Sequence, residues 1–510
     1  MTALVPTRRT ILAGAAALAA TPSPARAAGV LRAACIGTAL QNLDPGKATT
    51  APDFWVLWAL FNGLAKFDPT MTIVPDLAEG WETPEPTRWV FGLRRGVLFH
   101  DGTEMTAGDV VFTLDRLRDP AFGSPNRSKL AAVSRVRALS PYQVEITTDR
   151  PFAPLLTYLT NTRSGTQIVP RRAVEALGPA DFTKAPIGTG AFKLVEWRPN
   201  EKIILAAHPG YFGGRPALDM VEIPLINEES TAVNALLGGN IDLIGRAPFD
   251  QAQRLEKMPA LEMYRSPGMN TRYMSLNLRR PPFDDVHFRR AVSMAFDRSL
   301  VVRAVLFNEG RPSQGSIPSA LSWAFDTVPR AVCQFNPAAA KAELAKSKYG
   351  PGQAATVLTF GSSWWRRWAE LFATQVNQVL GTKFTVEVTD STTAFQRDKR
   401  HEYDALTWGW AGLIEADEYL SECFHSAGWR NTGGYANAQV DALLDKQRET
   451  LDLVERGKLC IAAERLIAED APVIFTMQAN VHQVHTKAVR GWEGRPYEAF
   501  GAQFAGVSLG

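Results

Sequence analysis

Three consecutive segments near the middle of the chain constrain the fold more than any other feature. Val221–Leu225 and Ile241–Ile244 have the composition of short buried strands, and Thr231–Leu237 between them has helical spacing and ends at Gly238-Gly239. A strand, a helix and a second strand in this order form a βαβ unit, whose strands lie parallel in one sheet. The sequence therefore predicts an α/β protein.

Strands and helices are mixed along the rest of the chain. Ala191–Trp197 and Ile203–Leu205 flank the turn Pro199-Asn200-Glu201 and predict a β-rich stretch of two strands. Trp89–Leu93 and Val97–Phe99, on either side of Arg95-Gly96, predict an antiparallel hairpin.

Three helices are also predicted. Thr106 and Asp109 have the spacing of a capping box and predict a helix that starts there. Val440–Arg448 and Asp452–Glu469 have the apolar spacing of two amphipathic helices.

The N-terminus has the layout of a cleavable export signal. Arg8-Arg9 precede an apolar run from Ile11 to Ala20, and Ala25-Arg26-Ala27 offers small residues to a signal peptidase. The run is shorter than the ~20 residues that cross a bilayer. We expect export by the twin-arginine route and cleavage after Ala27. The rival possibility, a lipidated Cys35, is disfavoured by Arg32 at a position where lipoprotein signals carry an aliphatic residue.

Composition then excludes several classes of protein. Without residues 1–27 the chain loses three arginines and no acid, which leaves 52 basic and 52 acidic residues. No basic stripe stands out, so neither nucleic acid nor a membrane surface is an expected partner. The four cysteines are scattered and favour buried apolar side chains; if one pair forms a disulfide, we expect Cys333 with Cys423.

Catalytic and metal motifs are not evident in the sequence. It contains no Gly-x-Ser-x-Gly elbow and no phosphate-binding loop, and His401-Glu402 lacks the second histidine of a zinc protease. His482 and His485 lie in a segment predicted to be a strand, which disfavours a metal site. We therefore expect no catalysis, no metal and no cofactor.

A series of motifs, spread over nearly the whole chain, resembles one family. In order, the stretches are Leu43-Asp44-Pro45, Phe61-Asn62-Gly63-Leu64, Val74–Glu82, Leu93–Thr103, Thr106–Phe112, Pro186–Phe192, Phe283-Asp284-Asp285, Phe288–Val292 and Ala295–Arg298. Together they resemble the extracytoplasmic solute-binding proteins, family 5, which serve ABC transporters for peptides, nickel and oligosaccharides.

The resemblance implies a two-lobed periplasmic-binding-protein fold of type II, the Venus-flytrap fold, with an extra α+β domain inserted in the first lobe. The first lobe would comprise residues 28–50, 184–272 and 480–510, and the second residues 273–479. The extra domain would comprise residues 51–183.

The family's pocket lies between the lobes, and this directs the choice of ligand-binding candidates. The main segment runs from Thr407 to Asp417, where Trp408 and Trp410 share one face of a predicted strand and flank Gly409. In the peptide binders that this segment resembles, a Trp-x-x-Asp motif supplies the carboxylate that pairs with the free amine of the peptide. Here Trp410 is followed three residues later by Leu413. Either Glu415 or Asp417 replaces the missing carboxylate, or the ligand lacks a free α-amine.

Further candidates come from three other segments. Arg366 and Arg367 open a predicted helix and suit an anionic end of the ligand. Other candidates lie beside the tryptophans, at the presumed crossover between the lobes and after the first strand: Ala411, Asn270, Thr271, Arg272, Tyr273, Thr38 and Gln41.

The resemblance implies a periplasmic, monomeric binding component that delivers a peptide or peptide-like ligand to a permease with its ATPase. Two alternatives stay open: a non-peptide solute, such as an oligosaccharide, an opine or a metal chelate, and a receptor that senses its ligand without transport.

Overall fold

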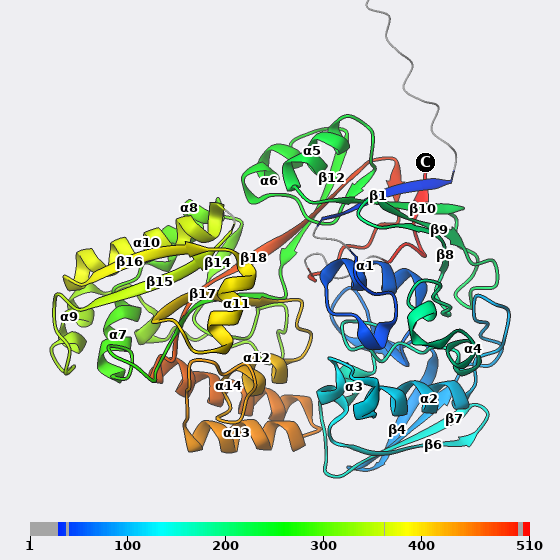
Figure 1. The fold of residues 1–510 in the computed structure, drawn as a ribbon, viewed down its shortest axis with the longest axis horizontal. Helices are drawn as coiled ribbons and strands as arrows, with labels where there is room; N and C mark the ends of the chain where they lie inside the picture. Colours follow the sequence, from blue (N-terminus) through cyan, green and yellow to red (C-terminus); the bar gives the residue numbers. More distant parts are fainter. Residues whose placement is uncertain (1–28, 37–39, 362, 498–502) are drawn as a thin grey trace, which may run out of the picture.

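The computed structural model describes residues 29–36, 40–361, 363–497 and 503–510. The expected signal peptide, the Ala27 cleavage position and Thr38 lie outside these residues. The described part contains no helix that is both long and apolar enough to cross a membrane. Its elements form two large bodies and a smaller domain (Figure 1).

One sheet passes through both large bodies. Its main strand order is β16-β15-β17-β13-β18-β11-β1-β10-β9-β8, and β12 and β14 also pair with β18. The first lobe contributes β1 (Val30–Ile36), β8 (Phe192–Arg198), β9 (Lys202–Ala207), β10 (Met220–Ile226), β11 (Leu243–Ile244) and β12 (Leu261–Pro267). The second lobe contributes β13 (Asn270–Leu276), β14 (Gly310–Pro312), β15 (Ala354–Phe360), β16 (Lys383–Thr389) and β17 (Ala405–Ala411).

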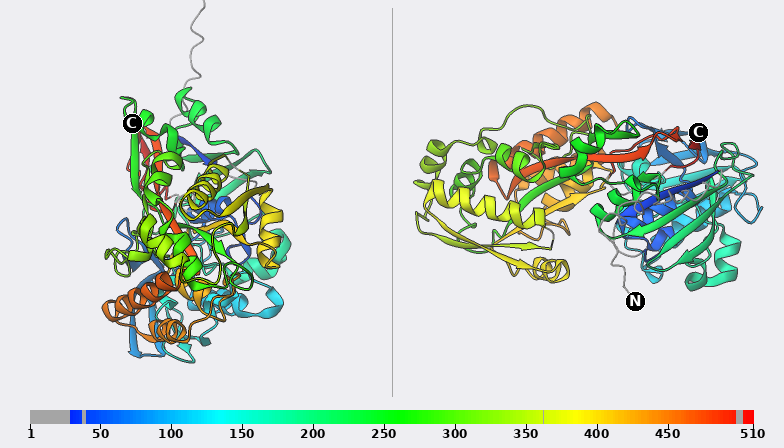
Figure 2. Two further views of the ribbon diagram at one scale, coloured as in Figure 1. Left: turned by 90° about the vertical axis from the view of Figure 1, so that its left-hand side faces the viewer. Right: turned by 90° about the horizontal axis from the view of Figure 1, so that it is seen from above.

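Strand β18 (Val473–Thr486) joins the two lobes. Its first part pairs with β13 and its last part with β12 and β11, and it runs from one body to the other in Figures 1 and 2. At the crossover, the Asn270 side chain makes the two hydrogen bonds that the backbone of a neighbouring strand would otherwise make. It donates to the Ala479 carbonyl at 2.9 Å and accepts from the Ala479 amide at 2.8 Å. Asn270 is fully buried, so these bonds hold β18 where the chain changes lobes.

The βαβ prediction is confirmed. Helix α5 (Glu229–Leu237) connects β10 to β11, and both strands pair in parallel with β1. The strands predicted at Ala191–Trp197 and Ile203–Leu205 are confirmed as β8 and β9, and the structure pairs them antiparallel. Helix α6 (Phe249–Glu256) follows β11.

The smaller domain carries its own sheet, of order β4-β5-β7-β6. These strands are β4 (Ala78–Glu85), β5 (Arg88–Leu93), β6 (Val133–Ser140) and β7 (Gln143–Thr148), and the neighbouring short strands are β2 (Ala65–Phe67) and β3 (Ile73–Pro75). Its helices are α2 (Ala107–Arg118), α3 (Leu155–Tyr158) and α4 (Arg171–Phe182). The capping box of Thr106 and Asp109 is confirmed at the start of α2.

The predicted hairpin is wrong. Strand β5 pairs with β4 and β7, and Val97–Phe99 makes only an isolated bridge between Leu98 and Glu104. Local alternation could not show that β5 has partners at both edges. Val97 and Phe99 are instead buried in the domain's core.

Helix α1 (Ala51–Leu60) packs into the core of the first lobe, although the predicted boundary at residue 51 assigns it to the inserted domain. Phe54, Trp55 and Leu57 share a buried cluster with Leu31 of β1 and Phe192 of β8. The apolar composition of α1 could not tell which core the helix would join.

The second lobe is covered by helices on both sides of its sheet. They are α7 (Val286–Met294), α8 (Arg298–Val305), α9 (Pro337–Leu344), α10 (Ser363–Leu380), α11 (Ser391–Lys399), α12 (Ala416–Phe424), α13 (Ala438–Glu449) and α14 (Leu453–Asp470). The last two match the predicted amphipathic pair. The strands β19 (Val489–Arg490) and β20 (Ser508–Leu509) pair near the end of the chain.

The four cysteines are all buried and free, so the pairing of Cys333 with Cys423 is not found. Burial raises the pKa of the Cys423 and Cys460 thiols to about 12. Both side chains therefore stay protonated at neutral pH and act as small apolar groups.

Candidate functional site

A cavity of about 840 Å³ lies between the two lobes. Its first-lobe wall comes from α1, from the start of α5 and from the segment that leads into α6; its second-lobe wall comes from the end of α8, the start of α10 and the end of β17. Residues Ala479–Val481 of β18 also line it. The crossover strand thus forms part of the wall of a cavity that both lobes enclose.

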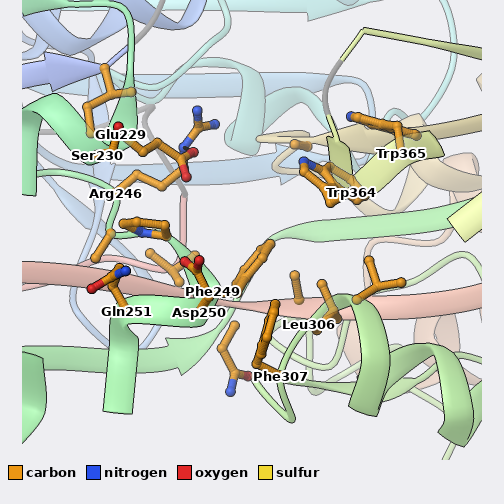
Figure 3. Close-up of a pocket in the computed structure, with 18 of the residues that line it drawn as sticks. Glu229, Ser230, Arg246, Phe249, Asp250, Gln251, Leu306, Phe307, Trp364 and Trp365 are labelled. Carbon is orange, nitrogen blue, oxygen red and sulfur yellow. Dashed lines mark ion pairs between the residues drawn. The ribbon is translucent and has the colours of Figure 1, made fainter. Parts of the chain in front are cut away.

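Aromatic side chains from both lobes meet in this cavity. Figure 3 shows Phe249 on the first-lobe side, facing Trp364 and Phe307 of the second lobe. The Phe249 and Trp364 rings lie edge to face, with centroids 6.5 Å apart. Trp365 stacks on Trp364 at 4.3 Å.

Charges on the cavity wall are separated by lobe. Its acids, Glu228, Glu229 and Asp250, come from the first lobe. The first lobe also supplies Arg246, which pairs with Glu229 at 2.8 Å.

The second-lobe wall carries Arg272 and Arg367. Arg272 is largely buried; it donates to the Trp410 carbonyl at 2.9 Å and lies 5.7 Å from the Trp365 ring. Arg367 is exposed and donates to the Ala304 carbonyl at 3.3 Å. The second-lobe wall is therefore positive and the first-lobe wall contains the carboxylates.

Some of the predicted ligand-binding residues lie at this cavity. Ala411, Arg272 and Arg367 line it. Arg366, next to Arg367, points elsewhere: it is exposed and pairs with Glu370 at 2.7 Å along α10. The helix that these arginines were predicted to open is confirmed as α10.

The tryptophan pair lies beside the cavity and is not part of its lining. The Trp410 ring nitrogen donates to the Tyr273 hydroxyl at 2.8 Å, and the Arg430 guanidinium lies 3.9 Å from the Trp410 ring centroid. Trp408 packs against Phe395, with ring centroids 6.0 Å apart. Both tryptophans are half-buried on β17, the strand that was predicted there, and protein side chains pack against their rings.

The residues that follow β17 are buried in the second lobe. Leu413 is in a hydrophobic cluster and is 1% exposed. Glu415 pairs with Arg456 at 2.5 Å, and Asp417 pairs with Arg448 at 2.7 Å. Both carboxylates thus have partners within their own lobe, and neither is brought to the cavity.

The remaining candidates have structural contacts. Asn270 is the crossover residue described above, and Thr271 is fully buried. Tyr273 is buried beneath Trp410. Gly409 leaves room for Thr271, whose carbonyl lies 2.3 Å from where a Cβ would stand. Gln41 is exposed, and its backbone amide donates to Asp53 at 2.7 Å.

The sequence reasoning missed most of the cavity wall. Phe249, Phe307, Trp364 and the acids of the first lobe were not singled out. The one available signal was the pair Trp364-Trp365 immediately before Arg366-Arg367, because two adjacent tryptophans at a helix start cannot both face the core.

A second contact between the halves lies where the smaller domain meets the end of β17, α12 and α13 (Figure 1). Lys129 lies 3.4 Å from the Glu418 carboxylate, and Arg163 donates to the Ala411 carbonyl at 3.1 Å. The Ala153 amide donates to the Arg448 carbonyl at 2.7 Å. We call these six residues the charged interface; one of them, Ala411, also lines the cavity.

No group of three or more acids, histidines or cysteines suited to a metal ion occurs among the described residues. His482 lies on β18, as predicted, and its Nε2 pairs with Glu309 at 2.7 Å. Burial lowers the pKa of His482, with Glu309 opposing this shift. The histidine therefore has a structural partner at the crossover.

Comparison with known proteins identifies relatives along nearly the whole chain. The family model of bacterial extracellular solute-binding proteins, family 5, matches residues 72–431. The glutathione-binding protein GsiB of Escherichia coli K12 is 27% identical over 480 residues, which covers 91% of this chain and 92% of the relative.

Solved structures give the same result for the fold. HbpA2 from Haemophilus parasuis has a TM-score of 0.82 at 24% identity and covers 94% of this chain and 100% of its own. The PBP AgaA from A. tumefacien R10, in complex with agropinic acid, has a TM-score of 0.80 at 26% identity and covers 94% of this chain and 99% of its own.

Proposed function

Because the chain belongs to the bacterial extracellular solute-binding proteins of family 5, we propose that it captures a peptide or peptide-like compound between its lobes and delivers it to an ABC permease. Its predicted type II binding-protein fold is confirmed by the likeness to HbpA2. The observation that carries the proposal is the cavity of about 840 Å³ with walls from both lobes. A ligand there contacts two bodies that are joined by few strands.

The proposal includes a periplasmic location, export by the twin-arginine signal and action as a monomer without catalysis. It also includes the predicted division into lobes, with α1 reassigned to the first lobe because of its packing and residues 270–272 reassigned to the second because β13 pairs with β17. The similarity to a glutathione-binding protein and to a protein that binds agropinic acid supports a small, charged, peptide-like or amino-acid-derived ligand.

A non-peptide solute is the alternative that one observation favours. Leu413 stands at the position where the resemblance to free-amine peptide binders implies an aspartate. Its side chain is buried among apolar side chains. Glu415 and Asp417 are bonded to arginines of their own lobe. A ligand without a free α-amine would need no replacement for that carboxylate.

Native mass spectrometry of the protein purified from its host's periplasm tests the proposal. We expect a mass excess from a retained small molecule, which denaturation releases. The matched variants are Ser230→Trp, which puts a large side chain at the cavity wall, and Ser322→Trp at an exposed position that does not line it. The first should lose the mass excess and the second should keep it.

Small-angle scattering supplies the second measurement. A ligand shifts two lobes toward the closed form only by its greater affinity for that form. The radius of gyration should therefore be smaller with the released compound than without it. Absence of a retained compound, together with an unchanged radius across host periplasmic extracts, would contradict capture between the lobes.

A further inference from the structure

A continuous row of aromatic rings leads from the cavity along the second lobe. The successive rings are Phe249, Trp364, Trp365, Phe360 and Trp408, with centroid separations of 6.5, 4.3, 4.7 and 5.9 Å. All five side chains are half-buried. The first three line the cavity, where they present π surface and apolar edges that a ligand can cover.

Phe307 extends this aromatic surface at a conformational cost. It follows the last residues of α8 and has a φ of 52°, and Asn308 after it has a φ of 66°. This left-handed position beyond a helix end is ordinarily taken by glycine or asparagine, because a Cβ is strained there. A bulky phenylalanine is a marked exception.

Burial does not compensate for this strain. The Phe307 side chain is 41% exposed and lines the cavity (Figure 3). Strained residues that gain nothing from the protein core cluster at ligand sites, where the bound molecule supplies the missing contact. A ligand group packed on Phe307 would do so here.

Positive charge lies beside these rings. The Arg272 guanidinium is 5.7 Å from the Trp365 ring, and Arg367, three residues after Trp364 on α10, lines the same cavity. The carboxylates of the cavity are on the opposite lobe, where Glu229 is already paired with Arg246. An apolar ring held at the second lobe therefore places its attached groups near two guanidiniums, which favour an anion.

We propose that the cavity binds compounds that carry a planar aromatic group and a neighbouring carboxylate, with Phe307 and Trp364 contacting the ring and Arg367 the carboxylate. This inference rests on the proposed function, since it names the class of solute that the same cavity takes. It makes Phe307 a determinant of specificity.

Calorimetric titration with three simple probes tests the proposal: N-acetyl-L-tryptophan, its amide, which lacks the carboxylate, and N-acetyl-L-alanine, which lacks the ring. We expect the first to bind at least about tenfold more tightly than either of the others. Phe307→Ala should weaken it by about tenfold. Phe335→Ala, at an exposed phenylalanine of the same lobe outside this cavity, should leave its affinity unchanged.

Equal affinities for the tryptophan and alanine probes, or no binding of the tryptophan probe, would overturn the inference. An undiminished affinity in Phe307→Ala would overturn the role of that residue. These failures are separable from failure of the proposed function. A retained compound without a ring, lost in Ser230→Trp, would leave solute capture intact while contradicting the aromatic class.

Discussion

Two of the contact regions between the halves of the molecule, the cavity and the charged interface, differ in almost every respect. The cavity is open, and its aromatic side chains are only partly buried; one of these residues, Phe307, has a strained backbone. The charged interface is filled, and its Lys129 and Glu418 are only 9% and 2% exposed. The difference teaches that contact between the halves and space for a ligand are supplied by largely separate sets of residues, with Ala411 in both.

Glu418→Ala gives the largest expected effect and tests the filled contact. Its carboxylate neutralises buried Lys129 and also accepts from the Ile414 amide at 3.0 Å. Because the buried lysine would lose its carboxylate and keep the Arg163 carbonyl as an acceptor without a countercharge, we expect a loss of about 3–5 kcal/mol in the free energy of unfolding, measured by urea denaturation.

The double variant Lys129→Met with Glu418→Gln is the control for this loss. It removes both charges and keeps an acceptor for the helix amides, so it should recover most of the stability. If Glu418→Ala lowers the free energy of unfolding by less than about 1 kcal/mol, the Lys129–Glu418 pair contributes no more than an ordinary surface ion pair.

The pH dependence of the free energy of unfolding tests a second buried carboxyl, Glu422, which lies on α12, the helix that also carries Glu418. Burial raises the pKa of this carboxyl from 4.5 to about 7; Arg430 opposes the shift, and Glu418 adds to it. The folded state therefore keeps a proton that the unfolded chain has lost, and this contribution to stability disappears as the pH rises through about 7.

Glu422→Gln should flatten the fall in stability between about pH 4.5 and 7, as followed by thermal unfolding in a pH series. Glu370→Gln, on the surface of α10, is the matched control and should keep the wild-type slope. Identical slopes in wild type and Glu422→Gln would assign the pH dependence to other groups.

Phe307→Gly should have a smaller effect on stability, and of opposite sign. Glycine adopts a φ of 52° without strain, so we expect the free energy of unfolding to rise by about 1 kcal/mol. Binding of N-acetyl-L-tryptophan should weaken in the same variant. If stability falls instead, Phe307 packs more tightly than its 41% exposure indicates.

Neighbouring arginines on α10 give the smallest expected change in stability. Arg366 pairs with Glu370 on the surface, and Arg367 lines the cavity. Each alanine substitution should change the free energy of unfolding by less than about 0.5 kcal/mol. Only Arg367→Ala should weaken binding of the tryptophan probe, and equal binding losses in both variants would contradict this division.

Sequence reasoning predicted the fold better than the site. The βαβ unit, the capped helix at Thr106 and the pair of C-terminal helices depend on local spacing, and the structure confirms them. The hairpin at Trp89–Leu93 failed because a strand's second partner, β7, comes about fifty residues later in the chain.

The site was harder to predict because its wall is assembled from distant segments. Phe249 and Trp364 are far apart in sequence and become neighbours only where the lobes meet. Glu415 and Asp417 looked available for a ligand, since the arginines that bind them lie on later helices. No pattern in the chain indicates that such acids are already occupied.

The position of β18 late in the sequence also sets an order of assembly. Neither lobe can complete its sheet before Val473–Thr486 has been synthesised, because this one strand pairs with β13 in one lobe and with β11 and β12 in the other. Both halves must therefore wait for nearly the whole chain. A ribosome that stops before Val473 releases two unfinished bodies rather than one finished lobe.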